Sequence, residues 1–212
     1  MKRKVIPEIL DGLTVDDPRA IRSRRDLRII NALMGNERWV VRQLEKHSGL
    51  DTVSELGAGR GELITRLTTA GWQCHGYDLQ PEPANLPVSA IWSTGDFFEF
   101  LEQDQSAAVV GSLILHHFEE PELAKLGELL SSKKLLIFSE PLRSSLAIAE
   151  GYLLFPLVNA VTKFDMMTSI RAGFLPGELP AKLGLEDDWE WHEKATVRGG
   201  LRSVALRKEK FI

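Results

Sequence analysis

Two groups of residues in this 212-residue chain have types and spacings that suit chemistry. The first is Glu55-Leu56-Gly57-Ala58-Gly59-Arg60-Gly61, in which alternate glycines follow a carboxylate. Glycines permit a sharp turn and a close approach of the backbone to a ligand. A carboxylate at this place would repel a phosphate and attract an ammonium group. The stretch therefore predicts a loop that binds a ligand with an amino group, and an ordinary tight turn is the alternative.

The second group is His116-His117, which follows a nearly unbroken apolar run at 107–115, together with Glu140 farther along the chain. An imidazole has an unperturbed pKa near 6.5 and can accept a proton close to neutral pH. We expect His117 first, or else His116, to be a general base, with Glu140 as its orienting partner. Two alternatives stay open. One of the two histidines could be structural, and Glu140 could be a turn residue paired with Arg143. No metal is expected, because no third ligand stands at a matching spacing.

The strands and helices expected around these two groups form an α/β fold. A strand at 52–56 leads into the glycines and a helix at 60–70, and a second strand at 72–78 ends in Asp78. An acid at the end of the second strand of such a unit can hold a pair of ribose hydroxyls. A turn or cap residue is the alternative for Asp78. Three prolines at 79–87 exclude an ordinary crossover helix there.

Further strands are expected at 88–92, 107–115 and 134–139, with a helix at 119–130. Asp96-Phe97 follows the third strand. A carboxylate beside an aromatic ring can bind an adenine there, and the alternative is that Asp96 caps a short helix. Two strand-like runs at 188–197 and 201–208 are separated only by Arg198-Gly199-Gly200, which forces an antiparallel hairpin. The parallel strands place their carboxyl ends at one edge, where α/β sheets hold ligands.

Residues outside the sheet are expected to cover it. Residues 1–15 read as an irregular arm, and helices from Asp17-Pro18 to about Met34 and at 37–46 form a helical cap within residues 1–50. The remaining domain, 51–212, carries an apolar helical insertion at about 142–165, split by Pro156 into two short helices. The insertion could form an apolar acceptor pocket or ordinary core.

Composition narrows the functional classes. The net charge of −4 disfavours nucleic-acid binding, and the single cysteine matches neither a disulfide nor a zinc spacing. We find no signal peptide and no apolar run long enough to insert stably into a membrane. A cytoplasmic location is expected by default.

Taken in order, these motifs resemble class I S-adenosylmethionine-dependent methyltransferases. The arginine-rich first helix, the Leu-His-His-Phe turn and the Ser-Ile-Arg-Ala-Gly-Phe segment look similar to small bacterial methyltransferases encoded beside type III polyketide synthases. The resemblance implies a Rossmann-like seven-stranded sheet, mostly parallel with a C-terminal antiparallel hairpin. It also implies S-adenosylmethionine as cofactor, with S-adenosylhomocysteine as product. The cofactor-binding residues it implies are Glu55, Gly57, Ala58, Gly59, Gly61, Asp78, Leu79, Asp96, Phe97 and Ser112.

The expected function is methyl transfer to a small molecule, to a hydroxyl oxygen of a lipophilic or phenolic acceptor. A non-catalytic protein that binds the same cofactor is the main alternative. A nicotinamide-dependent dehydrogenase conflicts with the glycine spacing and with Glu55. Base methylation is disfavoured by Leu115-His116-His117-Phe118, which stands where amino-group methyltransferases carry an Asn/Asp-Pro-Pro-Tyr-like turn. The oligomeric state is left open.

Overall fold

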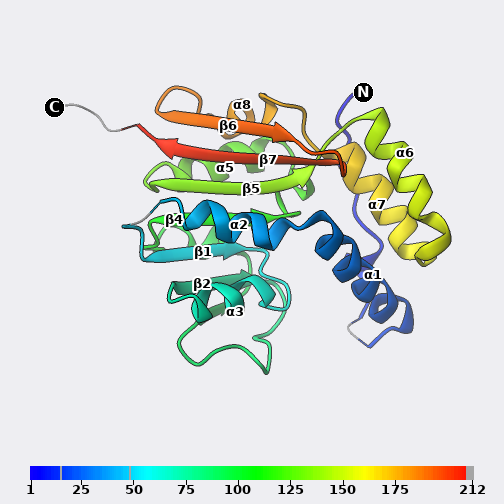
Figure 1. Cartoon of the computed structure of the whole chain (residues 1–212), viewed down its shortest axis with the longest axis horizontal. Helices are drawn as coiled ribbons and strands as arrows, with labels where there is room; N and C mark the ends of the chain where they lie inside the picture. Colours follow the sequence, from blue (N-terminus) through cyan, green and yellow to red (C-terminus); the bar gives the residue numbers. More distant parts are fainter. Residues whose placement is uncertain (15, 48, 209–212) are drawn as a thin grey trace.

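The computed structural model describes residues 1–14, 16–47 and 49–208, and its centre is one seven-stranded sheet of order β3-β2-β1-β4-β5-β7-β6 (Figure 1). Neighbours among β1 to β5 are parallel, and β7 is antiparallel to both β5 and β6. The predicted sheet with its C-terminal hairpin is therefore confirmed. The strands are β1 (Thr52–Leu56), β2 (Gln73–Asp78), β3 (Ile91–Thr94), β4 (Ala108–Ser112), β5 (Leu135–Pro141), β6 (Trp189–Ala195) and β7 (Gly200–Arg207).

Helices join the strands and cap one end of the sheet. They are α1 (Pro18–Met34), α2 (Asn36–Leu44), α3 (Glu62–Thr69), α4 (Phe97–Phe100), α5 (Glu120–Leu130), α6 (Ser145–Leu154), α7 (Ala160–Ala172) and α8 (Glu178–Leu183), with short 3-10 helices η1 (Leu10–Gly12), η2 (Leu115–His117) and η3 (Phe155–Leu157). As predicted, the Asp17 side chain caps α1 by accepting from the Arg19 N–H, and Pro18 occupies the first turn. None of the described helices is long and apolar enough to cross a membrane.

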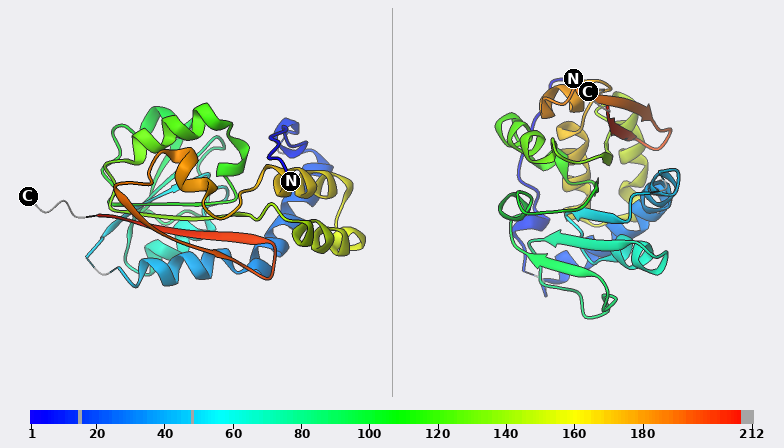
Figure 2. Two further views of the ribbon diagram at one scale, coloured as in Figure 1. Left: turned by 90° about the horizontal axis from the view of Figure 1, so that it is seen from above. Right: turned by 90° about the vertical axis from the view of Figure 1, so that its left-hand side faces the viewer.

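Apolar side chains fill both faces of the sheet, as a parallel sheet requires. On one face, Leu56, Val109 and Phe138 pack with leucines of α5 and α8. On the other, Val53 and Ile137 pack with residues of α2 and α3. The view from above in Figure 2 shows α5 on one side of the sheet and α2 on the other. Thus α2, which we expected in the cap, is part of a layer that covers the sheet.

The end of the sheet at the carboxyl ends of the parallel strands is capped by α1, α6 and α7 (Figure 1). The amino-terminal arm, residues 1–14, is tied across this end, because Ile9 N and Leu10 N donate to the Asp165 carboxylate at 2.7 and 3.1 Å. The insertion does bend at Pro156, but its second helix, α7, reaches Ala172 and is longer than predicted.

Several strand boundaries differ from those expected. The fifth strand, expected at 134–139, runs from Leu135 to Pro141 and so includes Glu140. The third strand was expected at 88–92 but begins at Ile91, because Ala90 N donates to Pro87 O in a turn. The fourth was expected at 107–115 but ends at Ser112. Leu113 has φ +57°, and the next backbone N–H groups donate to the Glu140 carboxylate instead of to a strand.

Candidate active site

The glycine loop connects β1 to α3 at the edge where the parallel strands end. Gly57, Gly59 and Gly61 have φ of +64°, +58° and +72°, the left-handed region that disfavours other residues. A Cβ on Gly57 would lie 2.8 Å from the Ile114 side chain, whereas a Cβ on Gly59 would meet nothing within 4 Å. The middle of the loop is therefore open, and the histidine turn lies directly beside it through Ile114.

Glu55 is the one carboxylate of β1 and stands two residues before Gly57. Its side chain is buried and its Oε2 atom has no hydrogen-bond partner. Burial, followed by the nearby carboxylates of Glu37, Glu62 and Asp78, raises the pKa of Glu55 well above its usual value. Two of these neighbours are paired with arginines, Glu62 with Arg60 at 3.8 Å and Glu37 with Arg66 at 3.2 Å. The raised pKa favours the neutral carboxyl of Glu55, and a cation bound beside it would favour the charged form.

Asp78 ends β2 next to the loop, as predicted. Its Oδ2 accepts from Gly59 N at 2.7 Å and its Oδ1 accepts from Gln80 N at 2.8 Å. The carboxylate therefore fixes the loop, and it retains lone pairs for a further donor. The next residue, Leu79, is 74% exposed, which places an unburied apolar side chain beside the loop.

The remaining predicted cofactor residues lie at the same edge of the sheet. Asp96 caps α4 by accepting from Phe98 N at 3.0 Å, as the alternative interpretation foresaw. Phe97 is buried and packs edge-on against Phe118, with ring centroids 5.5 Å apart. Ser112 ends β4 opposite Ser139 of β5, and Ala58 N donates to Tyr77 O.

Glu140 organises the histidine turn. Its buried carboxylate accepts from Ile114 N, Leu115 N and His116 N at 3.0, 2.9 and 3.3 Å, and it lies 2.8 Å from His116 Nδ1. The expected pairing of Glu140 with His117 is wrong, because the turn directs the His116 ring, and not the His117 ring, towards β5. Arg143 instead pairs with Glu178. Glu140 therefore fixes the orientation of His116.

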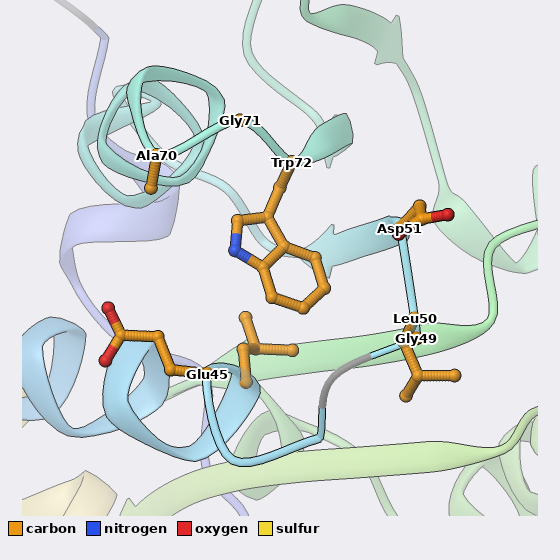
Figure 3. Close-up of a pocket in the computed structure, with 8 residues that line it drawn as sticks. Glu45, Gly49, Leu50, Asp51, Ala70, Gly71 and Trp72 are labelled. Carbon is orange, nitrogen blue, oxygen red and sulfur yellow. The ribbon is translucent and has the colours of Figure 1, made fainter.

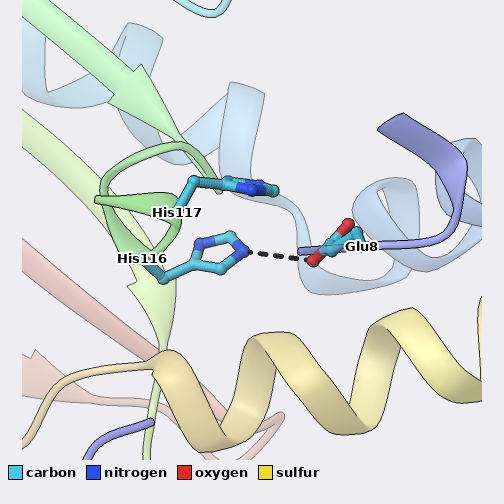
Figure 4. A group of neighbouring side chains, drawn as sticks. All are labelled: Glu8, His116 and His117. Carbon is cyan, nitrogen blue, oxygen red and sulfur yellow. Dashed lines mark ion pairs between the residues drawn. The ribbon is translucent and has the colours of Figure 1, made fainter. Parts of the chain in front are cut away.

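His116 has its second nitrogen directed at the amino-terminal arm. Nε2 is buried, has no hydrogen-bond partner and lies 3.6 Å from Glu8 Oε1, the contact drawn in Figure 4. Burial alone would lower the pKa of His116, but the hydrogen bonds and charges of Glu140 and Glu8 outweigh burial and raise it to about 9.

His117 lies beside His116, with ring centroids 4.3 Å apart, and its side chain is 27% exposed. Its Nδ1 is 3.7 Å from Asp11 Oδ2. Burial, and then the neighbouring His116, lowers the pKa of His117. Of the two rings, His117 is the more accessible.

Sequence reasoning missed Glu8 and Asp11. Both lie in an arm that shows no periodicity, and more than a hundred residues separate them from the histidines, so only the fold brings them together. Glu8, His116 and His117 each place one possible ligand atom within 4.8 Å of the others, a grouping that could also hold a metal ion and that the sequence spacing did not reveal.

Cavities are found elsewhere. One, of about 270 Å³, lies between the end of α2 and the start of β2 and is lined by Leu44, Leu50, Asp51 and Trp72 (Figure 3). Asp51 and Trp72 directly precede β1 and β2, so this cavity lies at the opposite edge of the sheet from the glycine loop. It contains none of the predicted site residues.

Comparison with known proteins shows the fold. No family model matches the chain, and no curated protein matches it in sequence. Among solved structures, it is similar to the plantazolicin methyltransferase BamL in complex with a triazolic desmethylPZN analog and S-adenosylhomocysteine. The two share 12% identity, the match covers 94% of this chain and 93% of that one, and the TM-score is 0.74.

Two further structures agree. Human N-acetylserotonin methyltransferase in complex with S-adenosylmethionine has 14% identity and a TM-score of 0.61 over 94% of this chain and 61% of that one. Magnesium protoporphyrin IX methyltransferase from Synechocystis, with bound S-adenosylhomocysteine, has 17% identity and a TM-score of 0.53 over 94% and 91%. The chain therefore has the Rossmann-like fold of these methyltransferases.

Proposed function

We propose that this protein is an S-adenosylmethionine-dependent methyltransferase that methylates a hydroxyl oxygen of a small lipophilic or phenolic acceptor. The observation that carries the proposal is the acidic, left-handed glycine loop at the carboxyl edge of the sheet. A ligand with an ammonium group would give the unpartnered Glu55 carboxyl a donor, and Asp78 keeps lone pairs for hydroxyl donors beside the loop. The three solved structures share the fold and were determined with this cofactor or its product.

The residues present fit such a ligand. The buried Oε2 of Glu55 has no hydrogen-bond partner, and the space above Gly59 is open. We assign the amino-acid end of the cofactor to Glu55 and to the loop residues Gly57, Ala58, Gly59 and Gly61. The ribose is assigned to Asp78, and the adenine to Leu79, Asp96 and Phe97, with Ser112 on the β4 side. When bound, S-adenosylmethionine supplies an activated methyl group whose leaving thioether is neutral.

The chain itself must align the methyl acceptor and remove its proton. Alignment of two reacting groups can lower a barrier by roughly 7–11 kcal/mol. We assign the proton to His116 Nε2, because Glu140 holds the opposite nitrogen of that ring at 2.8 Å and leaves Nε2 without a hydrogen-bond partner. Since the pKa of His116 is raised to about 9, only the unprotonated fraction of the ring can accept the proton, and we expect kcat to rise with pH up to about 9. His117, the first choice from sequence, becomes its more exposed neighbour.

Methyl transfer from labelled S-adenosylmethionine to phenolic and lipidic hydroxyls tests this assignment. We expect His116→Gln to lower kcat by about 10²–10⁴-fold, the usual contribution of general-base catalysis, with unchanged S-adenosylhomocysteine binding. His117→Gln is the matched variant and should cost less. Full activity in His116→Gln would refute its role as the base.

A non-catalytic cofactor-binding protein is the second candidate. Such a protein would bind the cofactor with the same glycine loop, so a cofactor-binding measurement does not distinguish it from an enzyme. The His116–Glu140 pair favours an enzyme, because a binding protein does not require an oriented imidazole beside its ligand loop. Cofactor binding without turnover on any acceptor would favour the binding protein.

A further inference from the structure

Helix α6 has apolar or aromatic residues at every position except Ser145 and Glu150, yet one side of it is exposed. Its inner side packs on Met167 and Ile170 of α7. In the described stretch 145–157, every exposed residue is uncharged. Four large side chains of this stretch are more than half exposed: Leu146, Tyr152, Leu153 and Leu157. Because a helix that is apolar on all sides is normally covered, this patch indicates a surface that binds something.

Helix α1 adds a second kind of exposed side chain next to this patch. Asp26 Oδ2 accepts from Asn159 N at 2.9 Å, and Ser23 Oγ lies 2.9 Å from Thr162 Oγ1. These contacts place α1 against the start of α7, which follows η3 directly, and Figure 1 shows α1, α6 and α7 together at one end of the molecule. The opposite side of α1 is exposed and mixes apolar with cationic side chains: Ile21, Ile29, Leu33, Arg22, Arg25 and Arg28.

The charge of α1 is opposite to that of the whole chain. The chain has a net charge of −4, whereas α1 holds five arginines against one carboxylate, the buried Asp26. Arg19 is paired with Asp17 at 2.7 Å, and three of the other arginines lie on the exposed side. Guanidinium groups beside exposed leucines and isoleucines match the surface of a bilayer. Its anionic headgroups attract the charges, and the apolar side chains can enter the boundary between headgroups and acyl chains.

A second copy of the chain fits this surface less well. Across a two-fold axis the same surface of each copy would meet its counterpart. The exposed arginines of the two copies would then lie close together, and like charges repel. A membrane surface supplies negative charge and apolar volume together.

We propose that the cap surface, which consists of the exposed residues of α1, α6 and η3 named above, docks on a bilayer that contains anionic phospholipids. The apolar side chains enter the interfacial region. The arginines stay at the level of the headgroups, because their long apolar stems let the charged ends reach polar surroundings. Since α1, α6 and α7 cover the edge of the sheet that has the glycine loop, docking turns this edge towards the bilayer (Figure 1).

Flotation of the full chain with lipid vesicles tests the proposal. One set of vesicles contains equal parts of phosphatidylglycerol and phosphatidylcholine, and the other contains phosphatidylcholine alone. We expect binding to the anionic vesicles to be tighter by about tenfold or more. Binding should weaken as the salt concentration rises from about 0.1 M to about 1 M, because salt screens the arginines. The absence of binding to the anionic vesicles would overturn the proposal.

Two sets of substitutions separate the charged from the apolar contribution. The triple variant Arg22→Gln, Arg25→Gln, Arg28→Gln should weaken binding to the anionic vesicles by about a hundredfold, at roughly fivefold for each arginine near the surface. The double variant Leu153→Ser, Leu157→Ser should weaken it by about tenfold or more, since membrane binding scales with the apolar area that is buried. All five side chains are exposed, so we expect unchanged unfolding in urea.

Matched controls lie away from the cap surface. Lys134 directly precedes β5, Lys208 directly follows β7, and Lys46 follows α2 beside the cavity at the same edge of the sheet. The triple variant Lys46→Gln, Lys134→Gln, Lys208→Gln therefore removes the same charge at the opposite edge. Val88→Ser removes an exposed apolar side chain between β2 and β3. Both controls should bind vesicles as the unaltered protein does, and losses equal to those of the cap variants would overturn the proposal.

Analytical ultracentrifugation of the same proteins tests the competing partner. We expect the oligomeric state to be the same with and without Leu153→Ser, Leu157→Ser. A dimer that these substitutions dissociate would show that the cap surface binds a second copy of the chain, and it would overturn the proposal. None of these measurements requires methyl transfer, so membrane docking and the function proposed above can fail separately.

Discussion

Glu140 is the residue on which the histidine turn depends. Its carboxylate satisfies three backbone N–H groups of η2 and the preceding residue, and it also binds the His116 ring. These hydrogen bonds fix the position of the Glu140 carboxylate. The same contacts explain why β4 ends early and why Leu113 tolerates a left-handed backbone.

The raised pKa of His116 predicts a pH dependence of stability. The folded pKa of about 9 exceeds the unfolded value of 6.5, so the imidazolium stabilises the fold fully below about pH 6.5. This contribution is lost as the pH rises through about 9. We expect the free energy of unfolding in urea to fall by up to about 3 kcal/mol across this window. His116→Gln should flatten that part of the profile, and an unchanged slope would show that the pKa of His116 is not raised.

Glu55 gives a second prediction at this scale. Glu55→Gln keeps the size of the side chain and removes the carboxyl that we assign to the cofactor's ammonium group, which would hold Glu55 in its charged form when bound. We expect S-adenosylmethionine affinity to fall by about tenfold to a hundredfold, as for a lost charge-assisted hydrogen bond, with stability unchanged or increased because a buried carboxyl is removed. Glu62→Gln, on the exposed side of the loop, is the control for a general electrostatic effect. Equal losses in both variants would contradict a direct contact.

At the scale of elements, the sequence patterns predicted the features that local residue types determine. They missed the features that depend on contacts between segments far apart in the chain. Alternating glycines after an apolar strand, the Asp17-Pro18 helix start and the tight turn at 198–200 are local signals, and each was found as predicted. The start of β3 and the end of β4 were missed, because a proline turn delays the start of β3 and the side chain of Glu140 binds the backbone that follows β4. The Glu8 and Asp11 contacts with the histidines were missed for the same reason.

The packing of α5 against α8 is a further prediction about elements. A Cβ on Gly127 would lie 1.7 Å from the carbonyl oxygen of Leu183, and backbone atoms cannot move aside as a flexible side chain can. We therefore expect Gly127→Ala to lower the free energy of unfolding by about 1–3 kcal/mol or more, despite the better helix propensity of alanine. Gly12→Ala, where nothing lies within 4 Å, should be nearly neutral in the same denaturation assay. Equal stabilities for the two variants would refute this close packing.

At the scale of the whole molecule, one edge of the sheet gathers the groups to which we assign a function. The strand ends carry the glycine loop and the His116–Glu140 pair, while the arm, α1, α6 and α7 cover the same edge (Figure 1). The residues that we assign to the cofactor lie at or next to the carboxyl ends of β1 to β4. The arm beside the histidine turn is held by hydrogen bonds from Ile9 N and Leu10 N to the Asp165 carboxylate.

The central claim is that the glycine loop binds S-adenosylmethionine, and calorimetric titration with S-adenosylhomocysteine tests it most directly. We predict one site per chain with micromolar affinity. Gly59→Val should weaken binding by about a hundredfold or more, because a β-branched residue resists the left-handed backbone and fills the open space above the loop. Gly12→Val should bind as the unaltered protein does. No binding of either S-adenosylhomocysteine or S-adenosylmethionine by the unaltered protein would contradict the account.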